Sequence, residues 1–169
     1  QEQMEALDSA EVSYRVVPGV TATFAAAASL KQELTLPGVS QTLVLTRLAG
    51  RTPVPDSEAL RNIARIGGTI CLYLSVGMMD RLVEELLAGD IFTEQTPVAV
   101  VYRASWPDEK IVEGTLVDIA QKVAKAGITR QALILVGEVL KARQHGVPEK
   151  SKLYDPDFAH GYRDKSSMV

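Results

Sequence analysis

The chain has 169 residues, 46% of them apolar, and a net charge of −3, which is typical of one globular domain and excludes disordered, collagen-like and low-complexity classes. The acidic balance gives no broad positive surface for nucleic acid, and the longest uncharged run, of fifteen residues, is shorter than the roughly 18–20 that span a membrane. One cysteine and two histidines are too few for a disulfide framework or a usual structural zinc site, so a reducing, cytoplasmic setting fits best.

The first elements in the chain are two helices with a strand between them. Residues 1–8 have the apolar spacing of an amphipathic helix. This helical pattern is already under way at Gln1, which is not an initiator methionine, so we expect the segment to come from a longer protein. Residues 13–17 are rich in β-formers and stop at a Pro-Gly pair, which predicts a strand. The Ala-rich stretch 23–31 predicts a helix whose small side chains allow close packing.

The middle of the chain alternates strands and helices. The pattern predicts a strand, a helix, a second strand and a second helix at residues 41–47, 56–66, 69–74 and 78–88. We expect Asp56 or Ser57 to cap the first of these helices, because short oxygen-bearing side chains satisfy free N–H groups at a helix start.

The last third predicts a hairpin, a helix and a final strand. Strands at residues 97–102 and 110–112 flank a loop of hairpin length, and a helix is expected from Thr115 with Asp118 approximating a capping box. An apolar run at residues 132–139 then predicts a buried strand. This order indicates an α/β fold with a mixed sheet flanked by helices.

Three loops are candidate binding segments because each is expected to follow a strand, where backbone N–H and C=O groups are not hydrogen-bonded to a neighbouring strand. They are residues 18–22, 74–78 and 103–107. For the first of them the alternative is a plain strand-to-helix turn with Thr21 as the N-cap. The sequence lacks the common phosphate-loop, dinucleotide, zinc-protease and serine-hydrolase motifs, so those activities have no signature.

Several strings of the sequence together resemble the tetrapyrrole (corrin/porphyrin) methylase family. They are VVPGVTA (16–22), LPGVSQTLVLTR (36–47), RTPVP (51–55), PVAVVYRASWPDE (97–109) and GITRQALILVG (127–137). The RTPVP and RASWPDE strings and the tail string SKLYDPDFAHGYR (151–163) resemble, within that family, the branch that methylates carbon 11 of precorrin-4 or cobalt-precorrin-4 in cobalamin biosynthesis.

The resemblance implies a homodimer with two α/β domains per chain and S-adenosylmethionine held in the cleft between them. It places residues 1–12 at the end of the N-terminal domain, residues 13–140 in the C-terminal α/β domain and residues 141–169 in a tail. The family's glycine-rich motifs would lie upstream of Gln1, so we expect this segment alone to be inactive.

The resemblance also implies the cofactor-binding positions. Thr21 and Ala22 match the family's PGxTA turn, Leu74 matches the apolar residue that ends the YxL strand, and Ala104 matches the small residue after PVAVVYR. Where the last strand begins, a looser match adds the final pair of positions, Gln131 and Ala132. Small residues fit such a site because they let backbone approach a ligand closely. No metal is required, and no catalytic base is identified.

Arginines at strand ends are candidate contacts for the substrate, which would carry several carboxylates. They are Arg47, Arg51, Arg103 and Arg130. The alternative for each is a solvated cation at the end of a strand. Trp106 has two interpretations, a wall of the tetrapyrrole site or a packing and interface residue, and the sequence slightly favours the second.

Two further functions stay open beside carbon-11 methylation. The first is another tetrapyrrole methylase, acting on uroporphyrinogen, precorrin-2 or precorrin-3B. The second is a non-catalytic dimerisation or binding fragment. Met78 and Met79 are expected in the core, and Cys71 is expected to be an inert buried thiol.

Overall fold

The computed structural model describes residues 1–142, 146, 149 and 151. The α-helices are α1 (Glu2–Ser9), α2 (Ala22–Leu30), α3 (Leu60–Ala64), α4 (Met79–Leu87) and α5 (Ile119–Lys125). The strands are β1 (Leu43–Arg47), β2 (Thr69–Tyr73), β3 (Pro97–Tyr102), β4 (Lys110–Thr115) and β5 (Ala132–Val136). Short 3₁₀ turns lie at η1 (Asp56–Glu58), η2 (Val76–Met78) and η3 (Glu138–Lys141).

The five strands form one mixed sheet in the order β1-β2-β5-β3-β4. β1 and β2 are parallel, whereas β2 with β5, β5 with β3, and β3 with β4 are antiparallel. The expected mixed sheet and the β3–β4 hairpin are therefore confirmed. β5 arrives last in the chain yet lies at the centre of the sheet, which explains its almost continuous apolar sequence.

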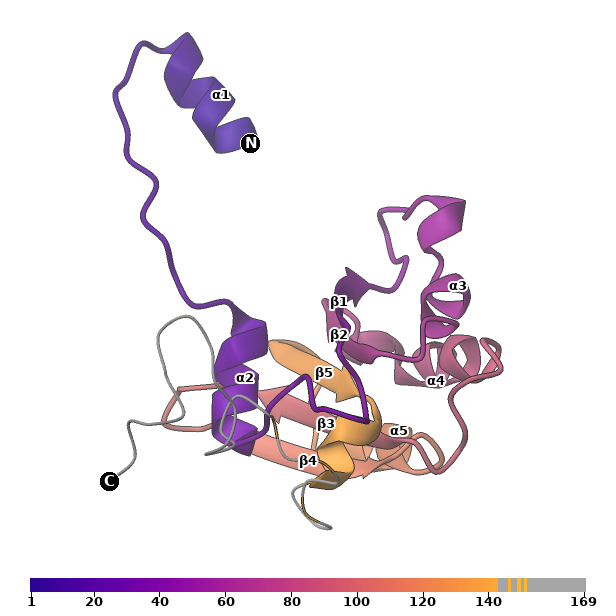
Figure 1. Cartoon of the computed structure of the whole chain (residues 1–169). Helices are drawn as coiled ribbons and strands as arrows, with labels where there is room; N and C mark the ends of the chain where they lie inside the picture. The colour runs from indigo at the N-terminus through magenta and orange to yellow at the C-terminus, as the bar shows by residue number, and fades with distance from the viewer. Residues whose placement is uncertain (143–145, 147–148, 150, 152–169) are drawn as a thin grey trace, which may run out of the picture.

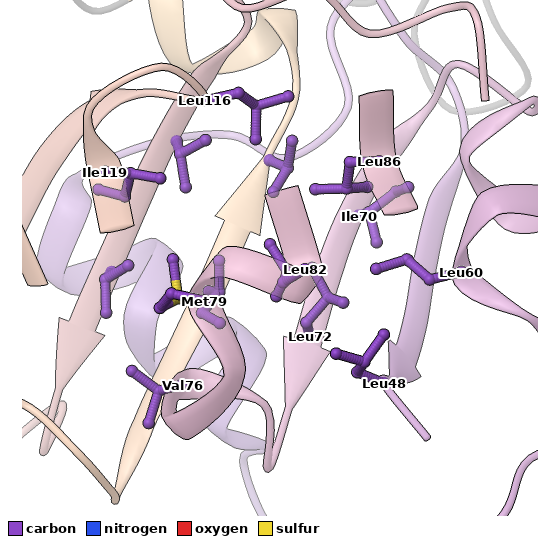
Figure 2. Close-up of a cluster of buried hydrophobic side chains, with 14 of the residues drawn as sticks. Leu48, Leu60, Ile70, Leu72, Val76, Met79, Leu82, Leu86, Leu116 and Ile119 are labelled. Atoms are coloured by element: carbon purple, nitrogen blue, oxygen red, sulfur yellow. The ribbon is translucent and has the colours of Figure 1, made fainter. Parts of the chain in front are cut away.

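Alternate residues of the central strands face two separate cores. On β2, Ile70 and Leu72 join a large core beneath α3, α4 and α5, while Cys71 faces α2 on the other side. Figure 1 shows this arrangement, with α2 on one face of the sheet and α3, α4 and α5 on the opposite face. Figure 2 shows the larger core, in which Leu72, Leu82 and Met79 converge between the sheet and α4.

The smaller core depends on the alanines of α2. Ala26 and Ala27 are buried against β3 and β5, and Leu30 fills the space at the end of the helix. Because alanine side chains are short, the helix backbone lies close to the sheet, as the composition of this stretch predicted. Cys71 lies in this core, so the expectation of a buried thiol is confirmed, and burial raises its pKa to about 11, which disfavours the reactive thiolate.

Residues 13–17 do not form a strand, so that prediction was wrong. This segment carries exposed apolar side chains, among them Val16 and Val17, and no sheet neighbour pairs with it. β-propensity reports the fit of a side chain to a half-buried sheet surface, and such a surface is lacking around these residues. α1, which precedes the segment, buries none of its residues and lies away from the sheet (Figure 1).

Other differences concern element ends. The predicted helix at residues 56–66 divides into η1 and α3, and neither start is capped by a side chain of Asp56 or Ser57. The helix expected from Thr115 begins only at Ile119, because β4 continues to Thr115 in register with β3. The Asp118 carboxylate accepts the Thr115 N–H at 2.8 Å and so marks the change from strand to helix.

The last predicted strand was also too long, since β5 ends at Val136 and the chain continues into η3. The tail assigned to residues 141–169 falls almost wholly outside the described residues, as does the SKLYDPDFAHGYR string after Ser151. Within the described part of the chain, no helix has the length and apolar character that crossing a membrane requires.

We predict that Leu72→Ala lowers the free energy of unfolding by about 2–5 kcal/mol, because it leaves a cavity in the larger core. The matched control is Leu45→Ala on the edge strand β1, where half of the side chain is exposed, and here we expect a loss below about 1 kcal/mol. Urea denaturation followed by circular dichroism measures both. Equal losses in the two variants would contradict the assignment of the core.

Candidate functional site

A cavity of about 520 Å³ lies where β2, β3 and β5 reach one edge of the sheet, beside the start of α2. Its wall is mostly apolar and contains several small residues, with two arginines at its margin. The lining residues are Ala22, Ala25, Tyr73, Leu74, Val76, Gly77, Met78, Val101, Arg103, Ala104, Trp106, Thr129, Arg130, Gln131, Ala132 and Leu133. This volume is in the range of small-molecule sites, about 300–1,000 Å³.

Three lining residues adopt a left-handed backbone although none is glycine. Leu74 follows β2 with φ of 55°, Arg103 follows β3 with φ of 49°, and Gln131 precedes β5 with φ of 55°. The strand register places all three at the same edge, since Tyr102 pairs with Ala132 and Leu72 with Ile134. Each such residue costs about 1–3 kcal/mol, and residues of this kind concentrate at binding sites. These backbone conformations therefore make this edge a candidate functional site.

The conformation at Leu74 is held by its buried neighbour Ser75. The Ser75 hydroxyl donates to the Tyr73 carbonyl at 2.7 Å and accepts the Leu48 N–H at 2.9 Å. These two bonds tie the end of β2 to the residue that follows β1. The Leu74 side chain is thereby turned outward and is 84% exposed at the cavity. A large exposed apolar side chain in a cavity wall is suited to contact a ligand.

The start of α2 is fixed to the sheet by the Tyr73 hydroxyl. This oxygen accepts the Thr23 N–H at 3.1 Å, lies 2.6 Å from the Thr23 Oγ1, and donates to the Thr21 Oγ1 at 3.3 Å. Thr21 is the N-cap residue by position, but its own side chain makes no capping bond. A phenol from β2 therefore does the capping, and it holds the turn that carries Ala22 to the cavity.

The β3–β4 loop forms the opposite wall and is braced from two sides. The Glu109 carboxylate accepts the Ser29 hydroxyl and the Ser105 N–H, each at 2.7 Å, which ties the loop to α2. These hydrogen bonds, that from Ser29 first, lower the pKa of the Glu109 carboxyl. On the other side, the Arg103 Nε donates to the Gln131 Oε1 at 3.0 Å. The loop thus has a defined position relative to both α2 and β5.

The chemistry of this wall fits S-adenosylmethionine. The alanines Ala22, Ala25, Ala104 and Ala132 leave room for a flat ring and let backbone groups approach it. Apolar side chains such as Leu74 and Met78 suit the thioether of S-adenosylhomocysteine, the form of the cofactor that remains after methyl transfer. No group of three or more His, Cys, Asp or Glu side chains within the described residues could hold a metal ion.

Five of the six predicted cofactor residues line the cavity: Ala22, Leu74, Ala104, Gln131 and Ala132. The sixth, Thr21, does not line it but lies within hydrogen-bond distance of the lining residue Tyr73. The segment 18–22 therefore reaches the site even though the strand expected before it is absent.

The four predicted arginines divide into two groups. Arg103 and Arg130 line the cavity. Arg47 lies in a neighbouring cavity of about 310 Å³ that shares Tyr73 with the first, and its guanidinium donates to the Thr52 and Pro53 carbonyls at 3.0 and 2.7 Å. Arg51 is exposed in the following loop and does not line the larger cavity. The structure therefore brings two arginines to the site and places a third next to it.

Some lining residues were missed or misjudged in the sequence. Tyr73 was seen only as a strand residue, although a tyrosine at a strand end beside exposed loops is a signal for a polar contact. Met79 is buried as expected, and Met78, which packs against the larger core, also lines the cavity. Trp106 is 58% exposed and lines the cavity, which agrees with the interpretation as a wall residue, while its packing on a second copy of the chain stays a prediction.

The sequence model of the tetrapyrrole (corrin/porphyrin) methylases matches residues 1–120. That match covers well over half of the chain, and the mixed sheet with flanking helices is shared with solved members. This chain belongs to the tetrapyrrole methylase family.

The similarity to individual members is high. A cobalt-precorrin-4 C(11)-methyltransferase from Methanocaldococcus jannaschii is 53% identical over 163 residues, which are 96% of this chain and 61% of that protein. The crystal structure of a cobalamin biosynthetic enzyme, cobalt-precorrin-4 methyltransferase, superposes with a TM-score of 0.78 at 47% identity and covers 82% of this chain and 58% of that one.

A third relative was solved with a ligand. It is a uroporphyrin-III C-methyltransferase from Thermus thermophilus complexed with S-adenosylhomocysteine, with a TM-score of 0.66, 29% identity, and coverage of 83% of this chain and 60% of that one. The chain thus spans about three fifths of the length of the relatives it matches.

We predict that Tyr73→Phe lowers the free energy of unfolding by about 1–2 kcal/mol, because the buried Thr23 N–H loses its acceptor. The matched control is Tyr14→Phe, whose hydroxyl donates only to the exposed Asp8 at 3.4 Å, and this change should stay within about 0.5 kcal/mol. Urea denaturation gives the energies, and amide hydrogen exchange should quicken at Thr23 in the first variant alone. Unchanged exchange at Thr23 would contradict the capping role.

Proposed function

We propose that this chain forms part of an enzyme that methylates carbon 11 of precorrin-4 or cobalt-precorrin-4, with S-adenosylmethionine as the methyl donor in cobalamin biosynthesis. The observation that carries the proposal is the set of small and apolar residues gathered around one cavity at the strand ends. High identity to a protein named for this reaction supports the choice of substrate.

The cofactor would lie in the 520 Å³ cavity. Ala104 and Ala132 would approach the adenine through their backbone, and Leu74 would contact the apolar part of the cofactor. Thr21 and Ala22 would border it from the start of α2, in the position that the Tyr73 hydroxyl maintains. Gln131 would contribute its backbone, because its left-handed conformation turns the chain at the cavity margin.

S-adenosylmethionine supplies a sulfonium methyl group, which a nucleophilic carbon of the tetrapyrrole takes by in-line displacement to leave S-adenosylhomocysteine. What the chain contributes is position: its rigid strand ends hold one reactant in a fixed orientation. Alignment of two bound reactants can remove roughly 7–11 kcal/mol of a barrier. The proton that the ring loses needs an acceptor, and no side chain of this cavity is assigned that task.

The substrate carboxylates would meet arginines near the same edge. Arg130 lies in the cavity lining, and Arg47 lies in the adjoining cavity across Tyr73. Arg51 is exposed nearby in the chain, and Arg103, the fourth candidate, lies in the cavity lining, where it pairs with Asp108. A guanidinium binds a carboxylate through two parallel hydrogen bonds, which orients the substrate as well as attracting it. The proposal includes a homodimer in a reducing, cytoplasmic setting, as the family resemblance and the single buried cysteine suggest.

A chimera tests the substrate, because the chain covers only part of its relatives. In it, this chain replaces the matching segment of the Methanocaldococcus jannaschii relative. With methyl-labelled S-adenosylmethionine, we predict methyl transfer to cobalt-precorrin-4 and none to uroporphyrinogen III. Transfer to uroporphyrinogen III instead would establish the alternative methylase. If the chimera transfers no methyl group while the unaltered relative does, the result would favour the alternative that this chain is a non-catalytic binding fragment.

In the same chimera, Arg47→Ala should raise KM for the tetrapyrrole about tenfold or more, the factor that one lost charge-assisted contact of ~1.4 kcal/mol produces. The dissociation constant for S-adenosylhomocysteine should change less than about twofold, because Arg47 lies outside the larger cavity. Arg65→Ala, on an exposed arginine after α3, controls for loss of charge. Equal losses of substrate and cofactor affinity would rule out the substrate role of Arg47.

A further inference from the structure

The Arg103 side chain makes two hydrogen bonds and two ring contacts with residues at the cavity margin. Its Nε donates to the Gln131 Oε1 at 3.0 Å, and its Nη1 donates to the Asp108 Oδ2 at 2.6 Å. Its guanidinium carbon lies over the rings of Tyr102 and Trp106, 5.2 Å from each centroid. We call these five residues the Arg103 clasp. An arriving carboxylate would have to compete with Asp108 for this cation, which is an unfavourable starting point for a substrate contact.

The clasp joins the two strand ends that need restraint. Tyr102 is the last residue of β3 and pairs with Ala132, the first residue of β5; Arg103, after the one, and Gln131, before the other, are both left-handed. The Arg103 N–H donates to the Gln131 carbonyl at 3.0 Å, so backbone and side chain both connect this pair. Left-handed backbone at residues other than glycine persists only where the surroundings impose it.

We propose that Arg103 is a positioning residue: it holds Gln131 in the left-handed conformation and so sets the backbone of Ala104 and Ala132 in the cavity wall. It acts through Gln131 and does not itself contact the ligand. The inference rests on the proposed cofactor site and goes beyond it, because it gives one of the candidate substrate arginines a different task. The planar guanidinium group of arginine matters here, because its Nε–H donates to Gln131 while the group also stacks on the rings of Tyr102 and Trp106.

The first test compares Arg103→Met and Arg103→Lys with the unaltered chain of 169 residues by calorimetric titration with S-adenosylhomocysteine. We expect both variants to bind about tenfold more weakly, since methionine lacks the donors and lysine lacks the planar group. Trp106 is the only tryptophan of the chain, so its emission and acrylamide quenching report on the clasp without any ligand. Both variants should change that emission. Arg65→Met, on an exposed arginine outside the cavity, is the matched control.

The second test repeats Arg103→Met in a Gln131→Gly background. Glycine adopts positive φ without steric cost, so a residue that acts by restraining position 131 becomes unnecessary there. We expect the tenfold effect of Arg103→Met to fall below about twofold in this background. The change in melting temperature caused by Arg103→Met should shrink in the same way.

Each result decides the proposal. Unchanged affinity and Trp106 emission in Arg103→Met, or in Arg103→Lys should the first variant not fold, would overturn it. An equal loss of affinity in both backgrounds would also overturn it and would show direct contact between Arg103 and the ligand. If the unaltered chain does not bind S-adenosylhomocysteine, the proposed cofactor site fails instead, and the melting temperatures then decide the positioning role alone: an equal decrease in both backgrounds contradicts it.

Discussion

The arrangement of the site depends on one constraint: β2 and β3 end and β5 begins at the same edge of the sheet, and a left-handed residue that is not glycine adjoins each strand there. Leu74 follows β2, Arg103 follows β3 and Gln131 precedes β5. Their conformations are unfavourable in isolation, and the folded chain maintains them through Ser75 and through the hydrogen bonds between Arg103 and Gln131. The stability of the packed sheet thus offsets the strain that shapes the cavity.

The two hydrophobic cores make this edge rigid. Strict alternation on the central strands buries one set of side chains beneath α3, α4 and α5 and the other beneath α2. α2 begins at the cavity, and the hydroxyl of Tyr73 anchors that beginning to β2. Tyr73 also lines the smaller cavity that contains Arg47, so one side chain borders both the expected cofactor site and a candidate carboxylate site. The proximity of these sites fits a reaction between two bound molecules.

The sequence predicted most of the fold because periodicity reports burial. The central strands and the helices facing them were predicted in the right order and region, although several of their ends differ, and the α/β class with a mixed sheet was correct. Residues 13–17 failed because β-propensity depends on an available sheet neighbour, which a single segment cannot reveal. The ends of β4 and α5 failed because register with β3, a tertiary contact, decides where β4 stops.

The candidate site was predictable only in part, and chiefly through resemblance. Residue types at Leu74, Ala104 and Ala132 say little in themselves, and it is the shared edge that brings them together. The capping by Tyr73 was invisible in the sequence, because its partners at Thr21 and Thr23 lie fifty residues away or more. The engagement of Arg103 by its own loop could not be predicted either, since it depends on paired left-handed turns.

The central claim is that the edge formed by these three strands binds the methyl donor. Titration of the ¹⁵N-labelled chain with S-adenosylhomocysteine, followed by amide chemical shifts, tests it most directly. We predict the largest shifts at Ala22, Leu74, Ala104 and Ala132, which line one cavity from four separate parts of the chain. Shifts concentrated instead between α4 and α5, around Asp80 and Gln121, or absent at saturating ligand, would contradict this account.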